Sequence, residues 1–169
     1  LVIAKTEEAL VHLSKQFFDR TSDRRYYALV WGDLEEDEGT ITGNIGRSQK
    51  NRKVFTVYEE DEGYGKHAVT HYKVVERFRY VTLVECKLET GRTHQIRVHL
   101  ECLRTPILGD VIYGQQGKRK VKVDRLMLHA WKLAFTHPVT GARIDGEAPP
   151  PPMFRETSEA LAALSPPRR

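Results

Sequence analysis

The sequence predicts an α+β fold in which a mixed, mainly antiparallel β-sheet is flanked by helices. Three observations support this fold class. Segments in which apolar and polar residues alternate outnumber segments with helical periodicity. Neighbouring strand segments are joined by short connections, which favours antiparallel pairing. The chain has 169 residues without an internal repeat, so it can form one domain with a hydrophobic core.

The first half of the chain supplies one helix and most of the predicted strands. Residues 1–5 have a strand pattern, and Thr6 can cap a helix over residues 7–19. The apolar residues of this helix recur at helical spacing and should form one stripe, namely Ala9, Leu10, Leu13 and Phe17. Four further strands are predicted at residues 24–31, 39–45, 66–76 and 80–88. The last two are joined by a short connection and should form an antiparallel hairpin.

The second half of the chain begins with a helix and continues with strands. The helix starts at Thr93, its predicted cap, and carries one row of apolar residues, namely Ile96, Leu100 and Leu103. Strands follow at residues 125–131, 132–136 and 143–147, with a hairpin turn at Thr140-Gly141. Residues 149–152 are all prolines and should form a stiff, extended segment. A short amphipathic helix is predicted after it, at residues 155–164. We expect one domain over residues 1–154 and a tail, with a short helix and a basic end, over residues 155–169.

Charge is segregated along the chain. The net charge of +4 permits a polyanionic partner without requiring one. One basic cluster lies at residues 46–53 and contains Arg47, Lys50, Arg52 and Lys53; a second contains Lys118, Arg119, Lys120, Lys122 and Arg125. The acidic runs at residues 35–38 and 59–62 lie elsewhere. This pattern favours a protein with one face for a polyanion and one solvent face, and two solvated loops are the alternative.

Cysteine content and hydropathy bear on the compartment. Cys86 and Cys102 have apolar neighbours in a predicted strand and helix, which suits buried free thiols in a reducing compartment. The sequence contains neither an apolar run long enough to span a membrane nor a secretory signal, so we expect a cytoplasmic protein. A zinc site is not expected, because there is no cysteine pair at ligand spacing and His94 and His99 are five residues apart.

The segment at residues 88–100 is the most informative part of the sequence. Two arginines, two histidines, a glutamine and threonines are concentrated where a strand ends and a helix begins: Thr90, Arg92, Thr93, His94, Gln95, Arg97 and His99. Free N–H groups and the positive end of the helix dipole favour an anion at such a place, either a phosphate or a carboxylate. A solvated first turn with structural arginines is the alternative.

Four stretches resemble the RluA-type pseudouridine synthases, which isomerise uridine in ribosomal and transfer RNA. The signature corresponds to TGRTHQIRVHL at residues 90–100 and PILGDVIYG at residues 106–114. RRYYALVWG at residues 24–32 and LHAWKLAFTHP at residues 128–138 agree with it. The resemblance extends from residue 1 to about residue 154. It implies the pseudouridine synthase catalytic-domain fold and an isomerase that detaches, rotates and reattaches the base, without a cofactor.

The resemblance also assigns catalytic roles to two residues. Arg97 matches the family arginine that pairs with the nucleophilic aspartate, and such a pair would keep the carboxylate ionised and oriented. Tyr26 matches the active-site tyrosine, whose ring can stack on a flipped uracil and whose hydroxyl can help to remove the C5 proton. Strand alternation places Tyr26 on one face with Ala28, and Tyr27 on the other. The alternatives are a surface helix arginine and a core tyrosine.

The remaining site prediction is an RNA-binding set. Arg92 and His94 are predicted to contact phosphates. Gln95 is assigned to the same set, with donation to a backbone carbonyl as the alternative, and His99 is interpreted as facing the sheet. The basic clusters should add further phosphate contacts, through Arg47, Lys50, Arg52, Lys53, Lys118, Arg119 and Lys120. The expected partner is a structured RNA, either ribosomal or transfer RNA, bound by a monomer that contacts no membrane.

The nucleophile itself is absent from the printed sequence. In the family it lies in a His-Arg-Leu-Asp-x-x-Thr-Ser-Gly segment directly before the strand that corresponds to residues 1–6. Asp110 belongs to a Gly-Asp-x-x-Tyr-Gly turn, which we interpret as structural and remote from Arg97. We therefore expect the aspartate upstream of Leu1 and an inactive chain in isolation. A non-catalytic RNA-binding module on the same scaffold is the alternative, and a hydrolase that uses His94 is a third, although no nucleophile-elbow motif is present.

Overall fold

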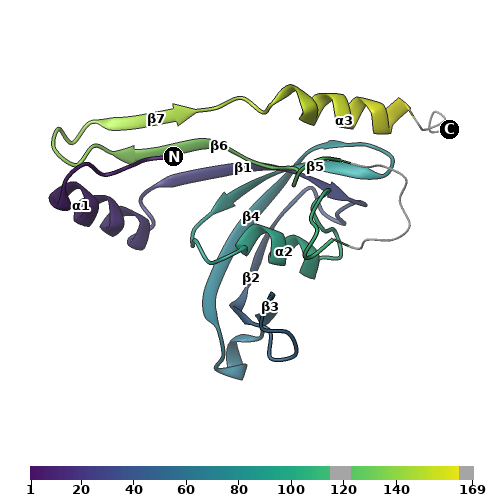
Figure 1. Ribbon diagram of the computed structural model, residues 1–169, viewed down its shortest axis with the longest axis horizontal. Coiled ribbons are helices and arrows are strands. Elements are labelled where there is room, and N and C mark those ends of the chain that lie inside the picture. The colour runs from purple at the N-terminus through teal and green to yellow at the C-terminus, as the bar shows by residue number, and fades with distance from the viewer. Residues whose placement is uncertain (115–122, 164–169) are drawn as a thin grey trace.

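A seven-stranded antiparallel sheet dominates the computed structural model, which describes residues 1–114 and 123–163 (Figure 1). The strand order is β3-β2-β4-β5-β1-β6-β7. The strands are β1 Asp23–Trp31, β2 Glu38–Arg47, β3 Phe55–Tyr58, β4 Lys66–Arg77, β5 Val81–Leu88, β6 Leu128–Thr136 and β7 Arg143–Glu147. The helices are α1 Glu7–Phe18, α2 Gln95–Cys102 and α3 Pro152–Ala163, with one 3-10 turn, η1 Glu60–Glu62. The predicted α+β class is confirmed. The sheet is not mixed, however, because each pairing between the described strands is antiparallel.

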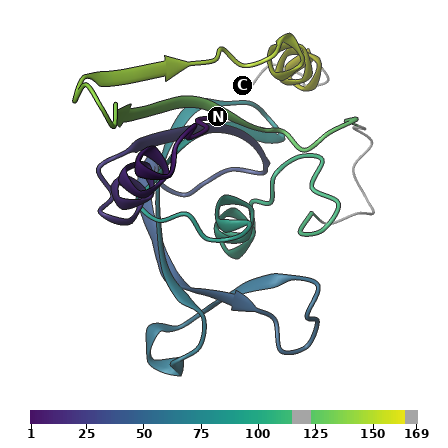
Figure 2. The same cartoon turned by 60° about the vertical axis from the view of Figure 1, so that its left-hand side comes forward.

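The sheet separates α3 from the other two helices. α1 and α2 lie on one side of the sheet and α3 lies on the other (Figures 1 and 2). β1 is covered on both faces, because Ala28 and Val30 point to one side, Leu29 points to the other, and all three are fully buried. The ends of β2, β3 and β4 extend beyond the helices as an arm (Figure 2). The start of α2 is placed against this arm.

The predicted hairpins are confirmed. β4 and β5 pair with the register Thr70↔Leu88 and Tyr72↔Cys86, and β6 and β7 pair across the turn at Thr140-Gly141. The predicted cap of α1 is also present, since Thr6 Oγ1 accepts a hydrogen bond from the N–H of Ala9 at 3.2 Å. An unpredicted contact anchors this helix: the amide of Gln16 donates to the carbonyl of Thr136 and accepts from its N–H, both at 2.7 Å.

Several element predictions were wrong. Residues 1–5 form no strand, and residues 125–136 form the single strand β6 after an irregular start. β3 was missed, because four residues carry too little pattern and this strand depends on its partner β2. α3 begins at Pro152 instead of Arg155, since proline fits the first turn of a helix.

Burial also corrects two predictions. Leu10 remains 56% exposed, so the apolar stripe of α1 is narrower than expected and centres on Leu13. Cys86 is fully buried, which raises the pKa of its thiol to about 12, whereas Cys102 is exposed on the outer side of α2. Only one of the two thiols is therefore the buried, unreactive group that the sequence indicated.

Candidate active site

The start of α2 is fastened to β4 by Gln95. Its amide nitrogen donates to the carbonyl of Val69 and to Thr70 Oγ1, both at 2.9 Å. Its amide oxygen accepts from Thr90 Oγ1 at 2.8 Å and from the N–H of Arg92 at 2.9 Å. All four hydrogen-bonding positions of the amide are thus used inside the protein, and the residue is buried. The RNA contact predicted for Gln95 is therefore wrong, and the alternative, donation to a backbone carbonyl, is confirmed. This side chain holds the helix in place.

His99 lies on the same side of α2 as Gln95, one turn further along. Its Nδ1 lies 2.9 Å from Thr70 Oγ1 and the residue is fully buried. Burial lowers the pKa of His99 to about 4, so the imidazole is neutral near pH 7. This agrees with the sequence interpretation that His99 faces the sheet.

The backbone at the start of α2 differs from the prediction. The residue before the helix is His94, in the left-handed conformation with φ of 56°, and it makes no side-chain cap. Thr93 is therefore not the cap. The left-handed turn reverses the chain so that the side chain of His94 points to the segment at residues 109–114, which we call the Gly-Asp turn. His94 Nδ1 lies 2.9 Å from the hydroxyl oxygen of Tyr113 in this turn.

Arg97 makes a two-pronged ion pair with Asp110. Nε and Nη2 of Arg97 donate to the two carboxylate oxygens at 2.7 and 2.8 Å. Asp110 also accepts from the N–H groups of Ile112 and Tyr113, and its carboxylate is inaccessible to solvent. Burial raises the pKa of Asp110, but these hydrogen bonds outweigh burial and hold it below its ordinary value. The expectation that Asp110 is remote from Arg97 is therefore wrong.

Tyr113 links the ion pair to the arm of the sheet. The guanidinium of Arg97 lies over its ring, 5.0 Å from the centroid. Its hydroxyl accepts from the N–H of Phe55 in β3 at 3.0 Å and contacts His94. Burial, followed by the charge of Arg97, lowers the pKa of His94, so a neutral imidazole faces the phenol. This cluster was not predicted from the sequence, because its members lie on three separate segments.

Tyr26 lies on the α1 and α2 side of the sheet. The strand register shows this. Thr70 in β4 contacts α2, and Tyr72, two residues further along β4, lies on the same face as Thr70. Tyr72, Cys86 and Tyr26 are direct neighbours across β4, β5 and β1, so Tyr26 shares that face. Tyr26 lines a groove of about 710 Å³ together with Phe17, Arg24 and the first two residues of the chain. No hydrogen bond or ring contact joins Tyr26 to Arg97 within residues 1–114 and 123–163.

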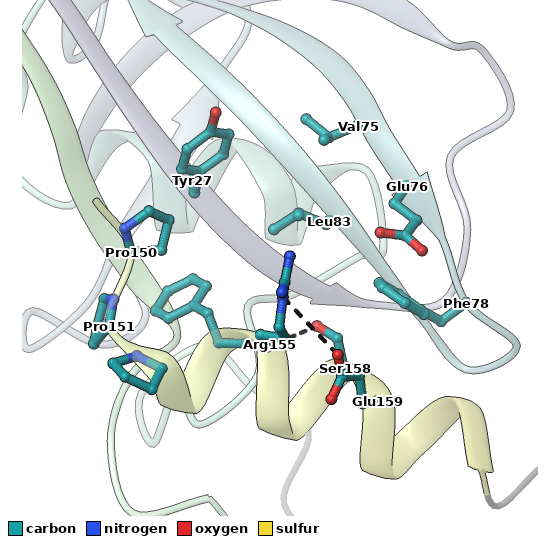
Figure 3. A pocket seen from close by; sticks show the side chains of 12 residues that line it. Tyr27, Val75, Glu76, Phe78, Leu83, Pro150, Pro151, Arg155, Ser158 and Glu159 are labelled. Atoms are coloured by element: carbon teal, nitrogen blue, oxygen red, sulfur yellow. Dashed lines mark hydrogen bonds and ion pairs between the residues drawn. The ribbon is translucent and has the colours of Figure 1, made fainter. Parts of the chain in front are cut away.

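Tyr27 lies on the opposite side, as predicted. Its ring stacks on Trp131 at 5.2 Å with an interplanar angle of 16°. It lines a second groove, of about 750 Å³, between the sheet and α3. Figure 3 shows Tyr27 and Leu83 facing the prolines and the side chains of α3 across this groove. The two neighbouring tyrosines therefore have different surroundings, and the predicted faces are confirmed.

The predicted RNA-binding cations are only partly brought together. Arg47 and Arg92 line one pocket of about 500 Å³ between the arm and the start of α2. Lys50, Arg52 and Lys53 are exposed in the loop between β2 and β3. Lys118, Arg119 and Lys120 lie outside the described residues.

Two kinds of site or segment are not found in the part of the chain that the structure describes. It contains no group of histidine, cysteine, aspartate or glutamate side chains arranged to hold a metal ion. None of its helices has the length and apolar character needed to cross a membrane.

Comparison with known proteins gives one consistent result. The family model described as RNA pseudouridylate synthase matches residues 1–102. An uncharacterised RNA pseudouridine synthase of Bacillus subtilis, YlyB, is 44% identical over 95% of this chain and 51% of its own length. The ribosomal large subunit pseudouridine synthase D of Nitrosomonas europaea is 45% identical over 97% of this chain and 48% of its own. The chain thus spans about half the length of these curated relatives.

A solved structure agrees with the sequence relatives. Human RNA pseudouridylate synthase domain containing 1 superposes with a TM-score of 0.77 at 29% identity, covering 91% of this chain and 66% of the human chain. The region matched by the family model includes strand β1, which carries Tyr26, and helix α2, which carries Arg97. The chain belongs to the RNA pseudouridylate synthase family.

Proposed function

We propose that this chain forms most of the catalytic domain of an enzyme that isomerises uridine to pseudouridine in RNA. The reaction detaches the uracil, rotates it and reattaches it through a carbon–carbon bond to the sugar, and it requires no cofactor. Three of the relatives, from Nitrosomonas europaea, Zymomonas mobilis and Vibrio cholerae, are named for the ribosomal large subunit. We therefore place structured ribosomal RNA first among the substrates and transfer RNA second.

The geometry of Arg97 supports this proposal most directly. Asp110 occupies Nε and Nη2, and no hydrogen bond to Nη1 is found among the described residues. The guanidinium is thus fixed along one edge while Nη1 remains available to a second anionic group. A nucleophilic carboxylate placed there would be kept ionised by the positive charge and oriented by the N–H donors. Asp110 is then a positioning residue, because it acts through Arg97.

Tyr26 completes the proposed machinery. Its ring lines an open groove on the α2 side of the sheet, with the guanidinium of Arg24 nearby. A uracil extruded from the RNA can stack on this ring. After the base is reattached, the tyrosine hydroxyl is proposed to assist removal of the proton at C5.

The nucleophile is proposed to lie outside these 169 residues. None of the aspartates in the sequence stands in a His-Arg-Leu-Asp context. Arg97 and Tyr26 can orient and stabilise, but neither supplies the carboxylate that breaks the glycosidic bond. We therefore propose that the chain alone is inactive, and that the complete enzyme works as a monomer in the cytoplasm.

The test compares the full-length protein with the 169-residue chain. Each is incubated with transcribed large-subunit ribosomal RNA and, separately, with transfer RNA, and pseudouridine is mapped at nucleotide resolution. Turnover by the full-length protein alone supports the proposal. Turnover by the 169-residue chain would require a nucleophile within it and would overturn the assignment. RNA binding without turnover by either protein would support the binding-module alternative.

A further inference from the structure

The pocket beside the start of α2 combines positive charge with aromatic rings. It has a volume of about 500 Å³ and lies between β2, the segment that leads into β4, and residues 91–93. Arg47, Lys66 and Arg92 contribute three cations, and Phe55 and Tyr64 contribute two rings. No carboxylate is among the described residues that line it. This composition matches the two parts of a nucleotide, a phosphate and a flat base.

Two of the residues that line the pocket, Gly46 and Gly65, are glycines in close contact with each other. A Cβ atom on Gly65 would lie 2.9 Å from the carbonyl carbon of Ile45, and one on Gly46 would lie 3.0 Å from a ring carbon of Tyr64. Gly65 also has a φ of 83°, which favours glycine. A larger residue at either position would therefore displace the facing backbone or the ring of Tyr64.

The cations are oriented but not neutralised. The guanidinium of Arg47 lies 5.0 Å from the centroid of Phe55 and donates one bond, to the carbonyl of Arg52. Arg92 donates from Nε to the carbonyl of His67 at 2.9 Å. Both contacts are to neutral acceptors, so each arginine keeps its charge and most of its donors. The nearest acidic run is partly occupied, because Glu60 pairs with His67 at 3.1 Å.

The rings are not equivalent. Phe55 is already covered by Arg47 on one side and meets His94 at its edge. Tyr64 is 42% exposed, and it meets Tyr58 with a centroid distance of 4.8 Å and an interplanar angle of 71°. That edge-to-face support holds the ring of Tyr64 while leaving surface open to the pocket. Of the two rings in the pocket, Tyr64 is the one that can receive a base.

We propose that this pocket is a subsite for one unpaired nucleotide of the substrate RNA. Arg47, Lys66 and Arg92 bind the phosphate, and the base stacks on Tyr64. The proposal rests on the proposed function, because it assumes an RNA substrate. It adds a preference that phosphate contacts alone cannot give. A base inside a duplex is covered on both faces by its neighbours and cannot stack on a side chain, so the pocket selects single-stranded RNA beside the reaction site.

The test measures binding of the full-length protein to two RNA probes, a single-stranded oligoribonucleotide and a blunt duplex of the same length. Tyr64→Ala should weaken binding of the single strand by roughly 5- to 150-fold and leave duplex binding unchanged. Tyr64→Phe keeps the ring and should bind like the wild type. Lys66→Gln should reduce the salt slope for the single strand by about 0.7, the contribution of one phosphate contact.

Two control variants are used: Tyr80→Ala is the control for Tyr64→Ala, and Lys73→Gln is the control for Lys66→Gln. Tyr80 is 43% exposed and has Arg79 over its ring, but it lies in the turn between β4 and β5, so Tyr80→Ala should leave both affinities unchanged. Lys73→Gln removes an exposed cation from the same strand as Lys66, away from this pocket. Equal losses for single strand and duplex with Tyr64→Ala, or no loss, would overturn the proposal. Failure of the wild-type protein to form pseudouridine would overturn the proposed function, while the binding measurements would still decide the subsite.

Discussion

The two sides of α2 carry similar polar side chains but differ in how fully the protein satisfies their hydrogen bonds. On the sheet side, Gln95 and His99 are buried, and the Gln95 amide is fully hydrogen-bonded to the protein. On the outer side, Arg97 is held by Asp110 along one edge only, and its side chain is 14% exposed. The amide of Gln95 therefore has no free hydrogen-bonding position, whereas the guanidinium of Arg97 keeps donors that Asp110 does not use.

This difference separates architecture from chemistry within a single motif. A group whose donors and acceptors are all satisfied by the protein cannot bind a substrate without losing those bonds. A group that is oriented by some bonds and keeps a free donor can bind an anion without reorganising. The motif therefore supplies both the attachment of the helix and the guanidinium that it presents.

The largest effect is expected on the outer side. In the full-length enzyme, Arg97→Met should lower pseudouridine formation by at least about 100-fold, because the nucleophile loses its orienting partner. It should also destabilise the fold by about 3–5 kcal/mol, since the buried carboxylate of Asp110 loses its counter-ion. Turnover and urea unfolding measure the two effects.

A double variant separates these two consequences. Arg97→Met with Asp110→Asn removes the buried charge together with its partner, so much of the stability should return while activity stays low. Near-normal turnover by Arg97→Met would refute the role proposed for this arginine.

The same comparison applies to the two faces of β1. Tyr26→Phe keeps the ring but removes the hydroxyl, and product formation should fall by about 100-fold or more if that hydroxyl assists deprotonation, with RNA affinity retained. Tyr27→Phe changes a ring that stacks on Trp131 beneath α3, on the other face, and should leave turnover nearly unchanged. Single-turnover kinetics distinguish the two variants. Equal losses at both positions would mean that the hydroxyl of Tyr26 has no special role.

The buried His99 on the sheet side of α2 should make the stability of the protein depend on pH. The pKa of His99 is lowered to about 4 from an ordinary value of 6.5, so the unfolded chain binds a proton between these values that the folded protein excludes. Stability should therefore fall as the pH decreases from 6.5 to 4, by about 3 kcal/mol at most. Urea unfolding across this range should show the loss, and His99→Leu should remove the part that His99 contributes. The lowered pKa of His94 adds a loss of the same sign, which this variant keeps.

An exposed histidine provides the control for this pH effect. His67→Gln leaves His99 in place and should retain the acid-dependent loss. Asp110 acts in a lower window: its pKa is depressed, so its contribution is present above its ordinary value of 3.8 and disappears only as the pH falls further. A His99→Leu variant that lost as much stability between pH 6.5 and 4 as the wild type would contradict the assignment.

The sequence predicted local features well and long-range contacts poorly. The β4–β5 hairpin follows from alternation and a short connection, and the cap of α1 follows from Thr6 before a helical pattern. The Arg97–Asp110 pair depends instead on how the segment after α2 folds back. That segment is fixed by the N–H of Leu108 donating to Leu29 and the N–H of Met127 donating to Leu108. No spacing rule within the motif encodes those contacts.

The Gln95 error has a related cause. The sequence left two kinds of partner open for Gln95, RNA and a backbone carbonyl, and only its contacts on β4 decide between them. Family resemblance could identify the residues that matter but not which of them face inward. The structure supplies that distinction, since burial is a property of the tertiary arrangement.

The smallest expected effect lies in the basic loop at residues 46–53, which contrasts with both sides of α2. Lys50, Arg52 and Lys53 are exposed, so they can bind phosphates only through flexible and strongly screened contacts. Replacing all three with glutamine should weaken RNA binding and flatten the log–log salt slope by at most about one unit per lost contact. Replacing Lys118, Arg119 and Lys120 should act in the same way. The matched control removes three exposed charges elsewhere, at Lys15, Arg79 and Arg155. If the control lowers affinity and slope as much as the loop variant, only the overall charge of the protein matters and the loop has no special place in the RNA-binding surface.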